Sequence, residues 1–163
     1  MTWNPADQKV YGAFYNTTKN GYVFGTLNLE TGAVNKLSDI TLQDDKGYPA
    51  GFVVIAANSI GEVYGISQMG DLYKFNTEDG SYSLIGATGY TPLYQQSGCF
   101  DFTTKQLYWA ACNENTSGIY QVNTDTGEAT LLGSFNDLEE FVGLYSLSPN
   151  ACLLYTSPSP RDS

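Results

Sequence analysis

Three copies of one pattern, Asn-x-x-x-Gly, decide the fold: Asn28-Leu29-Glu30-Thr31-Gly32, Asn76-Thr77-Glu78-Asp79-Gly80 and Asn123-Thr124-Asp125-Thr126-Gly127. Their glycines are 48 and 47 residues apart. Self-similarity at a nearly fixed interval indicates one supersecondary unit that is repeated, and a four-stranded propeller blade has a length of about 40–50 residues. The spacing therefore predicts a chain built from blade-sized repeats.

The remainder of each repeat keeps the same spacing. A tyrosine that follows an apolar residue opens each unit, at Tyr11, Tyr64 and Tyr108. Each repeat holds four short runs that are rich in Tyr, Val, Leu and Phe and separated by Gly and Asn, which is typical of strands. No window shows a sustained apolar period of 3.6 residues, so almost no helix is expected.

We therefore predict an all-β chain, a partial β-propeller with about three four-stranded antiparallel blades in an open arc. The expected limits are residues 1–150 for an incomplete propeller, with blades at about 1–40, 50–88 and 97–135 and the start of a fourth at 141–148. Three blades cannot close a ring, and each blade normally buries its faces against neighbours. The terminal blades are therefore expected to expose apolar surface and to make the chain self-associate.

In this arrangement the Asn-x-x-x-Gly copies are turns between the third and fourth strands of a blade. Asn caps a tight turn with its side chain, and Gly accepts a positive φ. Calcium binding is the alternative, because Asn76, Glu78 and Asp79 in one copy, and Asn123 and Asp125 in another, are oxygen donors. These copies lack the closing bidentate Glu of a calcium loop, so we favour turns.

The end of the chain breaks the pattern. Residues 152–162 resemble the translation of a transposase-based sequencing adapter, and they hold the single Arg of the chain. We therefore interpret residues 151–163 as a non-native tail and exclude them from fold reasoning. The native frame is expected to continue beyond Asn150, and Met1 is expected to be an internal methionine of a longer protein.

Composition narrows the functional classes. The chain carries 17 Asp and Glu against 7 Lys and Arg, a net charge of −10, and it has no His. So acidic a chain repels phosphate backbones, which argues against nucleic-acid binding. The absence of His removes the commonest general base and metal ligand, and we predict no catalytic residue, metal or cofactor. No segment approaches the roughly 20 apolar residues of a membrane span, so direct membrane insertion is not expected.

Two cysteines, Cys99 and Cys112, precede the tail. If Phe102 faces Leu107 in a hairpin, Cys99 pairs with Ala110 and lies diagonal to Cys112. A disulfide requires Cα atoms within about 7 Å. We favour two buried thiols over a bridge.

The loops that join blades share one face of a propeller with the loops between second and third strands, and ligands usually bind there. Several of these loop residues are aromatic, amide or acidic. Tyrosine offers a flat apolar surface with a polar tip, which suits a sugar or a basic protein surface. Packing between the blades is the alternative role for each ring. The candidate ligand-binding residues are Tyr48, Tyr90, Tyr94, Gln95, Gln96, Asp44 and Asp45.

Several stretches resemble propeller-repeat domains of secreted surface proteins from gut bacteria. They include Met1-Thr2-Trp3-Asn4-Pro5, Gly21-Tyr22-Val23-Phe24-Gly25, Gly70-Asp71-Leu72-Tyr73-Lys74, Pro92-Leu93-Tyr94-Gln95-Gln96-Ser97 and Phe141-Val142-Gly143-Leu144-Tyr145. The resemblance implies six to eight blades, export to the cell surface and attachment to larger modular proteins. It also implies a binding or scaffolding role, and it supplies no catalytic residues.

The leading hypothesis is thus a non-catalytic binding or scaffolding propeller that takes a glycan or a protein through its interblade loops. The alternative is a metal-dependent enzyme of the lactonase or lyase type with a cation in the central channel. Asp101 is the one acidic residue in an inner-strand run that could serve it. Fold alone does not decide between these functions.

Overall fold

The computed structural model describes residues 1–146, which form twelve strands and one short 3₁₀ helix, η1, at Asn136–Leu138. The strands are β1 (Thr2–Asn4), β2 (Lys9–Asn16), β3 (Gly21–Leu27), β4 (Val34–Ile40), β5 (Phe52–Ala57), β6 (Val63–Ser67), β7 (Asp71–Phe75), β8 (Tyr82–Ala87), β9 (Ser97–Asp101), β10 (Gln106–Cys112), β11 (Ser117–Val122) and β12 (Ala129–Ser134). The tail at 151–163 and the end of the predicted fourth blade lie outside the described residues.

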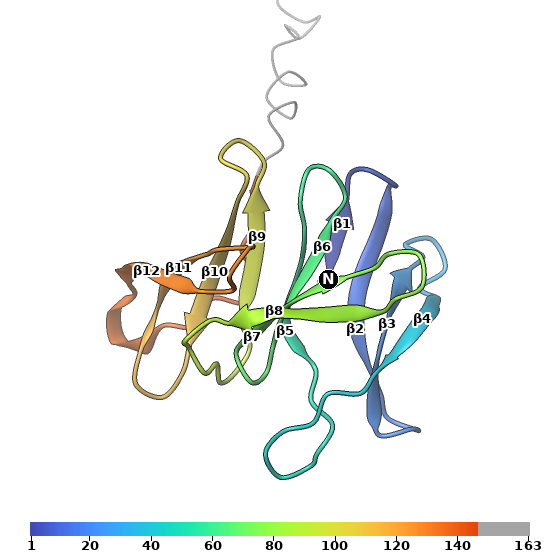
Figure 1. The fold of residues 1–163 in the computed structure, drawn as a ribbon, viewed down its shortest axis with the longest axis horizontal. Coiled ribbons are helices and arrows are strands. Elements are labelled where there is room, and N and C mark those ends of the chain that lie inside the picture. The colour runs from blue at the N-terminus through green and yellow to red at the C-terminus, as the bar shows by residue number, and fades with distance from the viewer. Residues whose placement is uncertain (147–163) are drawn as a thin grey trace, which may run out of the picture.

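The strands form three four-stranded antiparallel sheets in the orders β1-β2-β3-β4, β5-β6-β7-β8 and β9-β10-β11-β12 (Figure 1). Each strand pairs only with its neighbours in sequence. The first strands adjoin one another, β1 with β5 and β5 with β9, which leaves the fourth strands at the rim. The sheets do not close into a ring, so the predicted all-β, partial-propeller fold is confirmed. Within residues 1–146 no helix has the length and apolar character needed to cross a membrane.

Two hydrophobic clusters join the sheets. The first lies between the first two sheets and the second between the last two, and β6 of the middle sheet is buried along its whole length. The members of the first are Tyr11, Phe24, Ile40, Ile55, Ala57, Val63 and Phe75. The second contains Val54, Ala56, Tyr64, Ile66, Leu72, Phe100, Leu107, Trp109, Ala111, Tyr120 and Val122.

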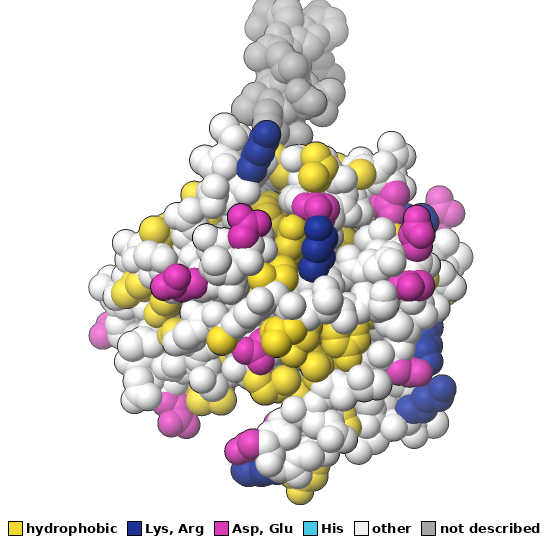
Figure 2. All heavy atoms as spheres, viewed as in Figure 1, with side chains coloured by type: hydrophobic (Ala, Val, Ile, Leu, Met, Phe, Trp, Pro, Cys, Tyr) yellow, Lys and Arg dark blue, Asp and Glu magenta, His cyan; other side chains and the backbone are white. Residues whose placement is uncertain are grey.

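The middle sheet is thus covered on both faces, whereas no sheet formed by residues 1–146 lies against the outer flanks of the first and third sheets (Figure 1). Large apolar side chains such as Trp3, Leu29 and Leu132 are exposed there. Figure 2 shows hydrophobic side chains gathered around the middle of one face, with acidic side chains scattered about them.

The Asn-x-x-x-Gly copies are turns between third and fourth strands, as predicted. The Asn28 Oδ1 accepts hydrogen bonds from the backbone N–H groups of Glu30 and Thr31, both at 2.9 Å. Asn123 caps its turn in the same way, and the Asn76 Oδ1 accepts the backbone N–H of Glu78 at 2.8 Å. The glycines have φ values of +72°, +75° and +88°. The capping oxygens are therefore used by the turns themselves, and residues 1–146 contain no cluster of three or more His, Cys, Asp or Glu that could hold a metal.

Two of these turns also set the distance between neighbouring sheets. A Cβ on Gly127 would lie 2.5 Å from the carbonyl oxygen of Gly86 in β8, and a Cβ on Gly80 would lie 2.7 Å from the Cβ of Leu37 in β4. The Ser38 hydroxyl donates a 2.7 Å hydrogen bond to the Gly80 carbonyl. Each turn therefore packs directly onto the rim strand of the preceding sheet.

The register of the β9–β10 hairpin differs from the prediction. Leu107 pairs with Phe100, so Cys99 faces Tyr108 rather than Ala110. The reason is the turn, which starts at Asp101: the Asp101 carboxylate accepts the backbone N–H of Thr103, and this places Phe102 in the turn. Cys99 and Cys112 are unbridged thiols. Cys112 is buried and Cys99 is half-buried, and burial raises the pKa of both thiols.

Replacing Gly127 by Ala should destabilise the chain by about 3 kcal/mol, because an L residue at positive φ costs about 1–2 kcal/mol and the new methyl collides with Gly86. Gly47→Ala is the control, since its φ is also positive but a Cβ there meets nothing within 4 Å. Urea unfolding should separate the two variants. Equal losses would contradict the direct packing of this turn on β8.

Two core tyrosines should make stability fall at high pH. Burial raises the pKa of Tyr11 and of Tyr64 from 10.0 to about 12. Because the folded pKa exceeds the unfolded one, the unfolded chain loses protons first, and stability that is complete below pH 10 is lost as the pH approaches 12. The loss should be about 2 kcal/mol for each ring. Denaturant titrations of Tyr11→Phe/Tyr64→Phe should show a shallower decline, and an identical decline would refute this account.

Candidate functional site

The loop between β8 and β9 is fixed to the third sheet by Tyr90. Its ring lies edge-on to Trp109 with centroids 5.3 Å apart and also packs against Tyr120 at 5.0 Å. Its hydroxyl donates a 2.7 Å hydrogen bond to the carbonyl of Thr116. The ring and the hydroxyl of Tyr90 therefore both hold the loop in place.

Gln96 anchors the other end of this loop. Its side chain is buried, and its Nε2 donates to the carbonyls of Leu93 and Cys112, both at 2.7 Å. Its Oε1 accepts a 2.8 Å hydrogen bond from the indole Nε1 of Trp109. One amide thus satisfies three buried polar groups, and it joins the loop to the core.

Tyr94 and Gln95 lie between these two anchors. Tyr94 is 61% exposed and has a positive φ of 66°, which turns the chain outward. Gln95 is exposed, and its backbone N–H donates a 2.8 Å hydrogen bond to the carboxylate of Glu140. The side chains of both residues project from a loop that is held on either side.

Beside them is a hollow of about 270 Å³ between the second and third sheets. Its walls combine the start of β5 with the interblade loop. It is lined by Phe52, Val53, Gln68, Tyr94, Gln95, Gln96 and Val142. The Gln68 Oε1 accepts the backbone N–H of Gly51 at 3.0 Å, which fixes this amide at the edge. In Figure 1 the interblade loops and the β2–β3, β6–β7 and β10–β11 loops gather at the lower edge.

The remaining candidates lie on a different loop. Asp44 organises a tight turn, since its carboxylate accepts the backbone N–H groups of Lys46 at 2.9 Å and Tyr48 at 2.8 Å. Asp45 and Tyr48 are exposed at its tip, and the loop extends away from the sheets between β4 and β5 (Figure 1). The structure therefore brings Tyr94, Gln95 and Gln96 together and places Asp44, Asp45 and Tyr48 outside that hollow.

Sequence reasoning missed four wall residues of the hollow: Phe52, Val53, Gln68 and Val142. The available signal was topological, because Gln68 follows the second strand of its blade and Phe52 begins the first. Both positions therefore lie on the face that carries the interblade loops.

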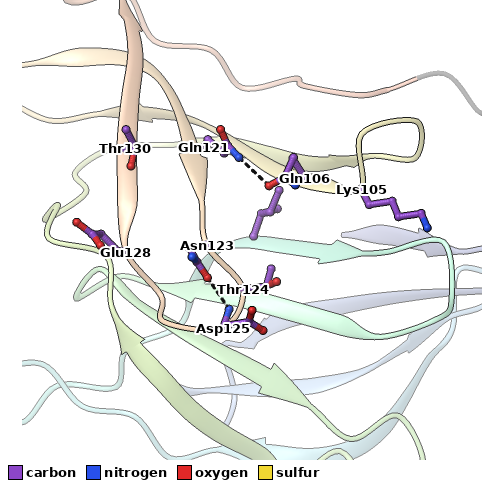
Figure 3. A pocket seen from close by; sticks show the side chains of 9 residues that line it. Lys105, Gln106, Gln121, Asn123, Thr124, Asp125, Glu128 and Thr130 are labelled. Atoms are coloured by element: carbon purple, nitrogen blue, oxygen red, sulfur yellow. Dashed lines mark hydrogen bonds between the residues drawn. The ribbon is translucent and has the colours of Figure 1, made fainter.

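A second hollow, of about 360 Å³, lies on the third sheet (Figure 3). It is polar, and across it the Gln121 Nε2 donates a 2.7 Å hydrogen bond to the Gln106 Oε1. Leu107 and Val122, their neighbours in sequence, point into the cluster shared with the middle sheet. Because side chains alternate along a strand, this hollow opens on the outer flank. It is lined by Lys105, Gln106, Leu107, Gln121, Asn123, Thr124, Asp125, Glu128 and Thr130.

Asp101, on which a channel-bound cation would depend, is engaged in a turn. Its carboxylate accepts hydrogen bonds from the Thr103 backbone N–H at 3.0 Å and the Thr104 hydroxyl at 2.8 Å. The hydrogen bond from Thr103 is the largest of the effects that lower the pKa of this carboxyl.

No family model matches the chain, and no curated protein matches it. Among solved structures, the chain is similar to a mutant puromycin hydrolase crystallised with PGG, at a TM-score of 0.44 and 15% identity. The match covers 82% of this chain and 20% of that one, so this chain spans about a fifth of the length of the hydrolase chain. The likeness concerns the arrangement of strands alone.

Replacing Gln96 by Met should cost about 2–4 kcal/mol of stability, because the Trp109 indole and the Leu93 carbonyl lose their side-chain partner and the Cys112 carbonyl keeps only the Leu93 N–H. Gln95→Met is the matched control, since the adjacent side chain is exposed and its loss should stay within about 0.5 kcal/mol. Unfolding followed by tryptophan fluorescence measures both. If the two variants proved equally stable, Gln96 would not be an anchor.

Proposed function

We propose that this chain is part of a non-catalytic binding or scaffolding propeller of an exported surface protein, and that it binds a glycan or a protein segment beside Tyr94. The observation that carries the proposal is the hollow between the second and third sheets. Export to the cell surface is supported by the resemblance to secreted propeller repeats. The uncovered flanks of the first and third sheets favour association of the chain with itself.

The chemistry of this hollow suits a sugar ring. Phe52, Val53 and Val142 offer apolar walls, and Tyr94 adds an exposed aromatic ring at the edge. Aromatic faces pack against the C–H surface of a ligand while the phenol stays hydrated. Gln68 and Gln95 supply amide donors and acceptors around that apolar surface. A few polar groups on an apolar wall are typical of small-molecule sites.

The loop that binds is also largely preorganised. Tyr90 and Gln96 hold the two ends of the segment that presents Tyr94, through the 2.7 Å and 2.8 Å hydrogen bonds described above. Ordering a loop on binding opposes affinity, so a loop that is already anchored retains more of the contact energy. Tyr90 and Gln96 thus support the site, and Tyr94 and Gln95 are the residues expected to touch the ligand.

Screening the chain on an array of immobilised glycans tests the proposal. Tyr94→Ala should weaken binding to a retained glycan about tenfold, which corresponds to the loss of one well-packed aromatic contact. Tyr15→Ala removes a half-exposed ring from the first sheet, and binding should not change. Tyr48→Ala shows whether the loop between β4 and β5 takes part. Equal affinity of the Tyr94 variant and the native chain would exclude this hollow.

A further inference from the structure

The contacts between successive sheets are built in the same way both times. The Asn-x-x-x-Gly turn of one sheet packs against the rim strand of the sheet before it, Gly80 on β4 and Gly127 on β8. At the second contact the approach is backbone to backbone, and Gly86 supplies the space: a Cβ there would lie 2.1 Å from the Thr126 carbonyl oxygen. A 3.0 Å hydrogen bond from the Ala129 N–H to the Thr88 carbonyl also joins the third sheet to the end of β8.

Each open flank carries one half of this contact: the first sheet has a free turn, and the third sheet has a free rim strand with a glycine. On the first sheet the turn ending at Gly32 has the same capping and the same positive φ, but a Cβ there would meet nothing within 4 Å. On the third sheet, Gly133 of β12 occupies the register position of Gly86. Each pairs with the third strand one step before the bulge, with Ile119 and Leu72 respectively. The nearest atom to a Cβ on Gly133 is 4.0 Å away.

The tyrosines that open the repeats show what each turn covers. Tyr11 and Tyr64 are 1% and 6% exposed. The turn of the following sheet also acts on both rings: Thr77 lowers the pKa of Tyr11 slightly, and the charge of Asp125 raises that of Tyr64. Tyr108 is the third tyrosine of the series and is only partly buried, and no sheet of the described part of the chain follows it on that flank.

The two flanks match in their apolar surface. The turn at 28–32 carries Leu29, which is 70% exposed, and Glu30, an exposed acid whose position matches that of Asp125. The flank of the third sheet offers the partly buried ring of Tyr108 beside the polar hollow of Figure 3, whose charged side chains are Lys105, Asp125 and Glu128. The apolar tip of the turn, Leu29, would cover the ring of Tyr108.

We propose that a second copy of this chain binds head to tail, with the turn at 28–32 of each copy packed on β12 and Tyr108 of the other. The contact is heterologous, and two copies that each span half of a ring make it twice and close the ring. Together they contribute six four-stranded sheets, within the range of closed propellers. The proposal specifies the self-association included in the proposed function and does not depend on the hollow at Tyr94, so the glycan experiment can fail without affecting it.

Light scattering during size-exclusion chromatography of the 163-residue chain at micromolar concentration tests the proposal. The expected mass is twice the 17.8 kDa of one chain. Leu29→Lys should give the mass of one chain, with association weakened at least about tenfold. Ile60→Lys is the control, because Ile60 is equally exposed, at 73%, on a turn of the middle sheet. This variant should stay assembled.

A second variant tests the opposite flank. Gly133→Lys adds a long side chain where the turn should pack, and it should give a single-chain mass, while Ser83→Lys on the rim of the middle sheet should not. Circular dichroism confirms that each variant is folded. The proposal is overturned by a native chain that is monomeric, by species larger than two copies, or by an assembly that either Leu29→Lys or Gly133→Lys leaves unchanged.

Discussion

The close approach of a glycine turn to the rim strand of the preceding sheet is the constraint on which the structure depends. At Gly86 and Gly127 two backbones meet with no room for a methyl group on either side. This contact fixes the spacing of the sheets at their rim, while the clusters around Phe75 and Trp109 fill the space nearer the axis. All three motif glycines have a positive φ, and at Gly80 and Gly127 the missing Cβ is needed as well.

Much of the fold follows from the sequence because its determinants are local. An Asn side chain caps its own turn, and the four runs per repeat lie within reach of tight turns, so strand number and order could be predicted. The register of the β9–β10 hairpin could not, because Asp101 begins the turn earlier than the apolar pattern suggests. The Asp101 carboxylate accepts hydrogen bonds from Thr103 and Thr104, and this turn removes Phe102 from the strand. The apolar periodicity of the sequence does not report such a side-chain hydrogen bond.

The face that carries the candidate site could be predicted from the sequence. Which loop residues anchor the loop and which stay exposed could not. Tyr90, Tyr94, Gln95 and Gln96 look alike in sequence, being polar or aromatic residues of one loop. The difference among them arises from long-range hydrogen bonds: the Trp109 indole donates to the Gln96 amide oxygen, and the Tyr90 hydroxyl donates to the Thr116 carbonyl. These partners belong to β10 and to the loop before β11, 13 and 26 residues away in sequence. Which side chains stay available to a ligand therefore depends on tertiary packing.

The burial of β6 along its whole length has a consequence for how the molecule opens. Repeat architectures store stability as a sum of unit and neighbour terms, so a unit with two neighbours is held more firmly than one at an end. Amide hydrogens of β6 and its partners should therefore exchange with solvent only through global unfolding, whereas the outer sheets should exchange through smaller openings. Since every strand pairs with its sequence neighbour, the contact order is low for an all-β chain, and the middle sheet is the natural nucleus from which order spreads in both directions.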